Sequence, residues 1–262
     1  MSLGQYIPGD SFIHKLDPRV KIAITILYMI AIFFVNSFIM YLPMVIYILL
    51  VVKIAGLDLR RMLKSLRPLL FIIIFTSVLN IITTPGEELF KIWKVVITKE
   101  GLIRAIFMSL RLILLVLGTS LMTLTTSPIS LTDGLESIFS PLKVIKFPAH
   151  ELSMMISISL RFIPTLFDEA DKIRKAQMAR GADFESGNVF RRAKNMIPLL
   201  VPLFINSFRR ADELAVAMES RCYRGSEGRT RLNPLKMESK DLITLAGAIV
   251  VFILIVLSKN YI

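Results

Sequence analysis

The chain has 262 residues, 54% of them hydrophobic, and a mean hydropathy of +0.65, which exceeds the roughly 45–50% apolar content of a soluble domain and indicates a membrane protein. Its net charge of +12 requires a membrane surface or an acidic partner, and nucleic acid is not expected because the aromatic residues lie mainly inside apolar runs. One cysteine, Cys222, excludes an internal disulfide framework, and two histidines leave little for a metal site.

Five apolar segments are candidates for transmembrane helices, because a span needs about 20 mostly apolar residues and interfacial residues can complete the shorter ones. The polar segment before the first of them does not resemble a cleavable signal peptide, so the first span is expected to be retained. The chain is therefore predicted to be an all-α, polytopic membrane protein with about five transmembrane helices. The predicted spans are residues 20–35, 38–55, 69–82, 102–126 and 242–257.

The distribution of lysine and arginine predicts the orientation, because basic flanks stay on the cytoplasmic side. Basic residues precede the first span and follow the second, whereas the link between them carries no charge, so the N-terminus is predicted to be cytoplasmic. Acidic and basic residues balance in 83–101, as suits an external loop. The predicted division is a membrane part, 1–126, a cytoplasmic domain of long helices, 127–240, and a last span, 241–262, that leaves the C-terminus outside.

Two apolar stretches in the cytoplasmic part, 152–167 and 197–208, are not predicted to cross the membrane. The first contains Arg161 and Pro164, and the second has about a dozen apolar residues with two prolines. Each runs into a charged helical segment. Such helices are expected to lie beneath the membrane with one end against the spans.

These two segments contain an internal repeat at an offset of 41 residues. Small and aliphatic residues lie along one helical stripe and lead to an arginine in both copies. The pattern is A-D-x-[IL]-x-x-A-x-x-[AS]-R-[GC]. Ala170, Asp171, Ile173, Ala176, Ala179, Arg180 and Gly181 match Ala211, Asp212, Leu214, Ala217, Ser220, Arg221 and Cys222.

The repeated arginines have two interpretations. Gly181 can end the first helix, and an arginine in a last turn interacts favourably with the helix dipole, so each arginine could be a helix cap. Alternatively, the small neighbours leave each guanidinium uncovered, and its five donors can enter a partner's groove and bind carboxylates or carbonyls. Two matched copies favour the second interpretation, with two related partners.

ATP-binding-cassette subunits are such a pair of partners. No glycine in the chain is followed by lysine, so the phosphate-binding loop G-x-x-x-x-G-K-[ST] is absent and ATP chemistry would belong to another chain.

The motifs LDPRVK, TTSP, PLK, SLRFIP, AQMARG and AMESRCYRG resemble the transmembrane (T) component of energy-coupling factor (ECF) transporters over nearly the whole chain. The resemblance implies that two arginine-ended coupling helices dock into two ATPase subunits, a homo- or heterodimer, which hold ATP and Mg while this chain binds no cofactor. It also implies a substrate-binding S component and a bacterial inner-membrane location. The matching docking residues are Ala179, Arg180, Gly181, Ser220, Arg221 and Cys222.

Other polar residues have structural and functional interpretations. Arg104 and Arg111 lie seven residues apart on one face of a predicted span. Arg104 can extend to the external interface, and Arg111 can contact a partner or an internal carboxylate. Arg161 is expected to pair with Asp168, Glu169 or Glu151. His150 and Glu151 begin like a metalloprotease motif, but Met154 replaces its second histidine. Cys222 is expected to be a small packing residue.

The sequence therefore predicts a non-catalytic subunit of an ATP-driven importer, with vitamin uptake preferred over a dedicated cobalt or nickel system. A self-sufficient secondary transporter fits less well, because the repeat lies outside the membrane part. An intramembrane enzyme fits less well because no nucleophile elbow, metal cluster or pair of intramembrane carboxylates is found.

Overall fold

The structure is a computed structural model that describes residues 6–92, 95–145, 147–184, 186, 188–225 and 235–257. Helices dominate these residues, which confirms the predicted fold class. A short antiparallel hairpin follows α5, with Glu88 opposite Thr98, in the segment expected to be an external loop. The elements are α1 (Phe12–Lys15), α2 (Pro18–Phe34), α3 (Phe38–Ala55), α4 (Leu59–Lys64), η1 (Arg67–Leu69), α5 (Leu70–Thr83), β1 (Glu88–Ile92), β2 (Val95–Thr98), α6 (Lys99–Thr125), α7 (Pro128–Phe139), η2 (Ser140–Ile145), α8 (Ala149–Ala179), α9 (Val189–Asn195), α10 (Ile197–Ser220) and α11 (Ser239–Leu257).

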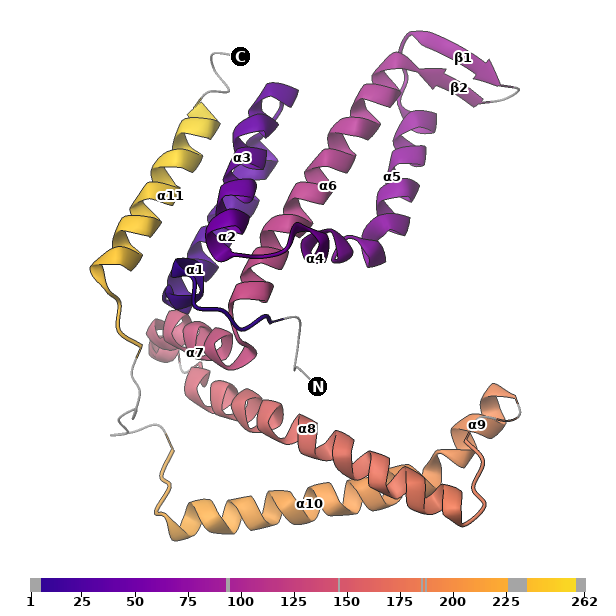
Figure 1. The fold of residues 1–262 in the computed structure, drawn as a ribbon, viewed down its shortest axis with the longest axis vertical. Coiled ribbons are helices and arrows are strands. Elements are labelled where there is room, and N and C mark those ends of the chain that lie inside the picture. The colour runs from indigo at the N-terminus through magenta and orange to yellow at the C-terminus, as the bar shows by residue number, and fades with distance from the viewer. Residues whose placement is uncertain are drawn as a thin grey trace. The chain divides into compact units, whose positions relative to one another are not determined.

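Contacts divide the described residues into two units, which are treated separately: 6–134 with 235–257, and 135–225. In the first unit, α11 packs on α2, α2 and α3 pack on α6, and α5 packs on the other side of α6 (Figure 1). The returning C-terminal helix thus joins the N-terminal helices in one bundle.

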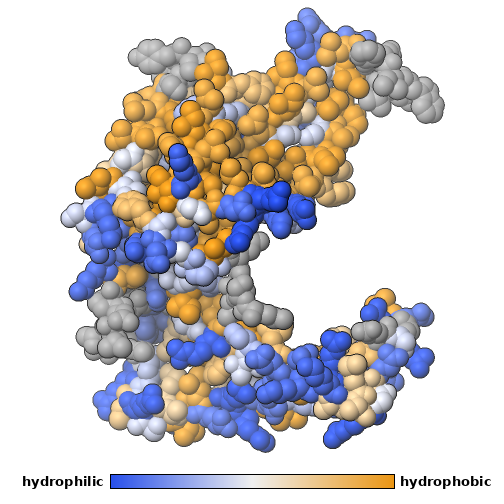
Figure 2. All heavy atoms as spheres, in the orientation of Figure 1, coloured by the Kyte–Doolittle hydropathy of each residue, from blue (hydrophilic) through white to orange (hydrophobic). Residues whose placement is uncertain are grey.

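Apolar residues cover much of this bundle's surface (Figure 2). Within the described residues, three helical segments are long and apolar enough to cross a membrane: Phe38–Ala55, Leu59–Thr83 and Lys99–Thr125. The two other predicted spans form α2, of 17 residues, and α11, of 19 residues, and their crossing stays a prediction. The stretches 152–167 and 197–208 are not among the three segments, and their position outside the membrane stays a prediction.

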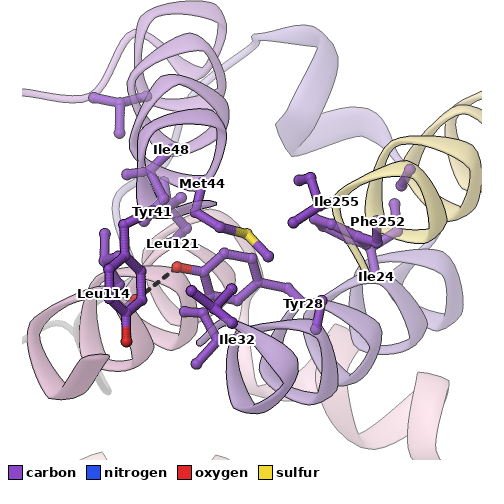
Figure 3. Close-up of a cluster of buried hydrophobic side chains, with 14 of the residues drawn as sticks. Ile24, Tyr28, Ile32, Tyr41, Met44, Ile48, Leu114, Leu121, Phe252 and Ile255 are labelled. Atoms are coloured by element: carbon purple, nitrogen blue, oxygen red, sulfur yellow. Dashed lines mark hydrogen bonds between the residues drawn. The ribbon is translucent and has the colours of Figure 1, made fainter. Parts of the chain in front are cut away.

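Tyr28 lies at the centre of the bundle core and is 2% exposed. Its hydroxyl donates a hydrogen bond of 2.9 Å to the carbonyl of Leu114, which satisfies a buried polar group (Figure 3). Its ring lies against Tyr47 and Phe252, so one side chain joins α2, α3, α6 and α11. Gly118 on α6 permits this approach, because a Cβ there would lie 2.1 Å from Cε1 of Tyr28.

A buried polar link connects the start of α2 with the start of α11. Asp17 caps α2 by accepting a hydrogen bond from the N–H of Arg19 at 2.8 Å. The N–H of Asp17 donates to Oδ1 of Asp241 at 3.0 Å, and Oδ2 of Asp241 accepts from the N–H of Glu238 at 2.8 Å. Asp241 therefore caps the start of α11 and binds the start of α2 with the same carboxylate.

Lys21 extends this network to α6. Its Nζ donates to the carbonyls of His14 and Thr125, each at 3.0 Å, and the residue is only 7% exposed. Buried lysines are rare unless they are paired. The motif LDPRVK therefore contributes two buried side chains, Asp17 and Lys21, that join four segments of the bundle.

We expect Gly118→Ala to lower the melting temperature of the detergent-solubilised chain, because the new methyl group collides with the Tyr28 ring and overpacking costs about 1–3 kcal/mol. Gly247→Ala is the matched control, since a Cβ at this position in α11 meets no atom within 4 Å. Equal melting temperatures for the two variants would contradict the tight contact between Gly118 and Tyr28.

Candidate functional site

The two arginine-ended helices of the repeat, α8 and α10, pack against each other in antiparallel orientation (Figure 1). Near the end of α8, Nε2 of Gln177 donates to the carbonyl of Pro198, at the start of α10, at 3.4 Å. Further from that end, Glu169 faces residues later in α10. Arg180 therefore lies beside the beginning of α10, whereas Arg221 follows its last residue.

Glu169 is the main polar link between these helices. Its Oε1 accepts a hydrogen bond from Nδ2 of Asn206 at 2.6 Å, and its Oε2 lies 3.3 Å from Nη2 of Arg210. The Glu169 side chain is 18% exposed, so this ion pair is partly shielded from solvent. The contact was not predicted, although the 41-residue offset aligns Glu169 with Arg210 and so places opposite charges at equivalent positions.

Helix α8 ends in a Schellman motif. The N–H of Gly181 donates to the carbonyl of Met178 at 2.9 Å, and the N–H of Ala182 donates to Gln177 at 3.0 Å. Gly181 has a φ of +86°, a left-handed conformation that glycine adopts without a Cβ penalty. The prediction that Gly181 ends the first helix is confirmed.

Helix α10 ends in the same motif. The N–H of Cys222 donates to Glu219 at 2.9 Å, and that of Tyr223 donates to Met218 at 3.0 Å. Cys222 occupies the left-handed position, with a φ of 57°, where a side chain is unfavourable. It is exposed, so it is not the packing residue that was expected. The sequence repeat is thus also a repeat of backbone geometry.

Both arginines occupy the C-cap position immediately before the left-handed residue, and both are exposed. Among the described residues, neither guanidinium forms a hydrogen bond or an ion pair. Backbone N–H groups already pair with two carbonyls in the last turn of each helix, so the arginine side chains are not needed as hydrogen-bonding caps for these groups. Two equivalent guanidinium groups remain available to other molecules.

The length of α10 separates these groups. It has 24 residues, which at 1.5 Å per residue corresponds to roughly 36 Å. One small ligand cannot reach both arginines over such a distance, whereas two protein domains, or two subunits, can each contact one.

The comparisons with known proteins agree with these features. The family CbiQ, described as cobalt transport protein, matches residues 9–232. The chain is 55% identical to the energy-coupling factor transporter transmembrane protein EcfT of Clostridium kluyveri, over 99% of this chain and 97% of the relative. It is 53% identical to EcfT of Thermosediminibacter oceani, over 92% and 91%, and 45% identical to EcfT of Lactococcus lactis, over 98% and 97%.

The chain belongs to the EcfT family. It is therefore a transmembrane transporter subunit and not an enzyme, as the sequence predicted. Within the part of the chain that the structure describes, no group of three or more histidine, cysteine or acidic side chains could hold a metal ion. His150 instead places its Nδ1 3.0 Å from Oε1 of Glu136.

Arg111 has a structural contact in this EcfT protein. Its Nη2 donates to the carbonyl of Val35, the C-cap residue of α2, at 2.7 Å, and the guanidinium lies 5.1 Å from the centre of the Phe107 ring. Its partner is thus a backbone carbonyl at a helix end rather than the carboxylate that was considered. The arginine therefore joins α6 to the end of α2 through a backbone carbonyl.

Arg104 and Arg161 are both exposed, and neither forms a hydrogen bond or ion pair with another residue in the described ranges. The expected ion pair of Arg161 is therefore not formed, and Glu169 pairs with Arg210 instead. The extension of Arg104 to the membrane interface stays a prediction.

We expect opposite effects from substitutions at the two left-handed positions. Gly181→Ala should weaken the end of α8 by about 1 kcal/mol, because alanine resists a positive φ, whereas Cys222→Gly should strengthen the end of α10 by a similar amount. Hydrogen–deuterium exchange of peptides covering each helix end measures both effects. Exchange that changes in the same direction in both variants would contradict the shared motif.

Glu169→Gln should loosen the α8–α10 pair by about 1 kcal/mol, because it removes a partly exposed ion pair while keeping the shape of the side chain. Faster exchange is expected in the facing segments of both helices. Asp168→Asn is the control, since this neighbouring acidic residue is exposed and has no hydrogen bond or ion pair among the described residues. A change of the same size in the control would show that Glu169 has no special role.

Proposed function

We propose that this EcfT protein couples two cytoplasmic ATP-binding-cassette ATPase subunits to a substrate-binding S component in the membrane. The observation that carries the proposal is the pair of identical helix ends, each presenting an exposed guanidinium that is not used for capping. The docking residues are Ala179, Arg180 and Gly181 at one end, and Ser220, Arg221 and Cys222 at the other.

The chemistry of arginine suits such docking. Its planar guanidinium stays charged and can form two parallel hydrogen bonds to one carboxylate, so it fixes both the position and the orientation of a partner. The left-handed residue after each arginine ends the helix, so the arginine lies at the helix terminus where a partner can contact it. A force applied at this point is transmitted along the helix and, through Glu169, to the neighbouring helix.

The remaining parts of the proposal concern location and chemistry. The chain is a multi-pass protein of the bacterial inner membrane, with the N-terminus and the coupling helices in the cytoplasm and the C-terminus outside. ATP and Mg bind to the partner ATPases, and this chain binds no cofactor. The S component selects the substrate, and a vitamin is the preferred class.

A dedicated cobalt or nickel importer is the second candidate. The description of the matching family as a cobalt transport protein favours it, whereas the names of the relatives specify no substrate. Transport assays of this chain with each candidate S component and the ATPases would distinguish the two, because a dedicated metal importer takes up Co²⁺ or Ni²⁺ and no vitamin.

Arg180→Ala and Arg221→Ala should each weaken binding of the ATPases by roughly 2–5 kcal/mol, because each leaves a buried carboxylate or carbonyl of the partner unpaired. The measurement is co-purification of the ATPases with the tagged chain, together with uptake by the reconstituted complex. The double variant should lose the most.

Two controls separate docking from general damage. Arg209→Ala removes an exposed arginine from the middle of α10 and should leave association unchanged. Arg180→Lys and Arg221→Lys keep the charge but lose the planar fork, so they should recover only part of the binding. Normal association and uptake in the double alanine variant would refute this mechanism.

A further inference from the structure

An apolar cavity of about 250 Å³ lies in the membrane bundle, in the half nearest α1. We call it the bundle cavity. All of its lining residues belong to the unit formed by 6–134 and 235–257, and they come from α1, α2, α3, α6 and α11 with Leu16. Its lining includes Phe12, Lys21, Tyr28, Ile54, Gly247 and Val251.

The polar side chains of the lining mostly have partners already. Lys21 donates to two carbonyls, and Tyr28 donates to the carbonyl of Leu114. The hydroxyls of Thr25, Thr125 and Thr244 donate to carbonyls one helical turn earlier. The cavity therefore offers mainly apolar surface, which suits an apolar ligand.

The bundle cavity opens to the molecular surface between α1 and α3. Phe12 and Ile54 line it and are 47% and 53% exposed. Two cations lie next to these lining residues in the sequence: Lys15 is the last residue of α1, one turn after Phe12, and Lys53 directly precedes Ile54 in the last turn of α3. The Lys15 side chain is 61% exposed, and its nearby carboxylate, Asp10, lies 3.9 Å away and is fully exposed.

We propose that the bundle cavity binds one acyl chain of a phospholipid whose anionic headgroup lies against Lys15 and Lys53. An apolar opening with two lysines next to its lining residues matches the two ends of such a lipid, since basic residues next to a membrane helix attract anionic headgroups. The acyl chain fills the space between α2, α3, α6 and α11, and the lipid becomes part of the packing of the bundle.

The test uses the full-length chain reconstituted into vesicles of equal parts phosphatidylglycerol and phosphatidylcholine, then extracted into detergent and analysed by native mass spectrometry. The wild-type chain should retain one phospholipid, enriched in phosphatidylglycerol. Gly247→Leu should reduce this retention at least tenfold, because its side chain fills the cavity from a position where a Cβ meets no atom within 4 Å. Val251→Phe is a second cavity-filling variant.

Matched controls isolate the two parts of the site. Val250→Leu enlarges an exposed residue of α11 outside the lining and should retain the lipid. Lys15→Gln with Lys53→Gln should keep one lipid but abolish the preference for phosphatidylglycerol, whereas Lys99→Gln, at the start of α6, should keep that preference. Wild-type retention in both cavity-filling variants would overturn the acyl-chain site, and equal retention of the two lipids by the wild type would overturn the headgroup assignment.

Discussion

The bundle depends on the buried hydrogen bond between the N–H of Asp17 and the carboxylate of Asp241, because this contact fixes where the last helix returns. The chain leaves the bundle after α6 and comes back only at α11, so sequence proximity cannot position α11. One carboxylate caps α11 and holds the start of α2, while Lys21 connects α2 to the end of α6. Buried charges are tolerated here because each has specific hydrogen-bonding partners.

A second constraint is that backbone groups within an apolar environment must find partners in the protein itself. Arg111 meets it by donating to the carbonyl of Val35 at the end of α2. The same constraint applies to the buried side-chain hydroxyl of Tyr28, which finds its partner in the carbonyl of Leu114. Gly118 makes the necessary close approach possible. These contacts connect helices whose surfaces are otherwise apolar, and they give the bundle a defined arrangement that nonspecific packing of similar side chains would not.

Helices α8 and α10 follow a different logic, in which backbone groups pair with each other at the helix ends and leave the arginine side chains available. In both α8 and α10 the Schellman motif pairs two carbonyls of the last turn with backbone N–H groups. The arginine at each C-cap is therefore not needed to bind them, and it is exposed. The helices are joined by the partly buried Glu169. This arrangement suits the proposed transmission of displacement from two separate contact points, because helices and a polar link connect them.

The sequence alone determined the helical class, the apolar segments and the arginine-ended repeat, because these depend on local patterns: runs of apolar residues, a 41-residue offset and a glycine at a helix end. It could not determine which polar residues pair across the chain. No local pattern showed that Asp17 and Lys21 are buried and bonded across the bundle. Glu169, one of the three carboxylates considered for Arg161, binds Arg210 instead. The tertiary structure decided these pairs, because Asp17 and Asp241 are separated by most of the sequence and meet only when α11 packs on α2.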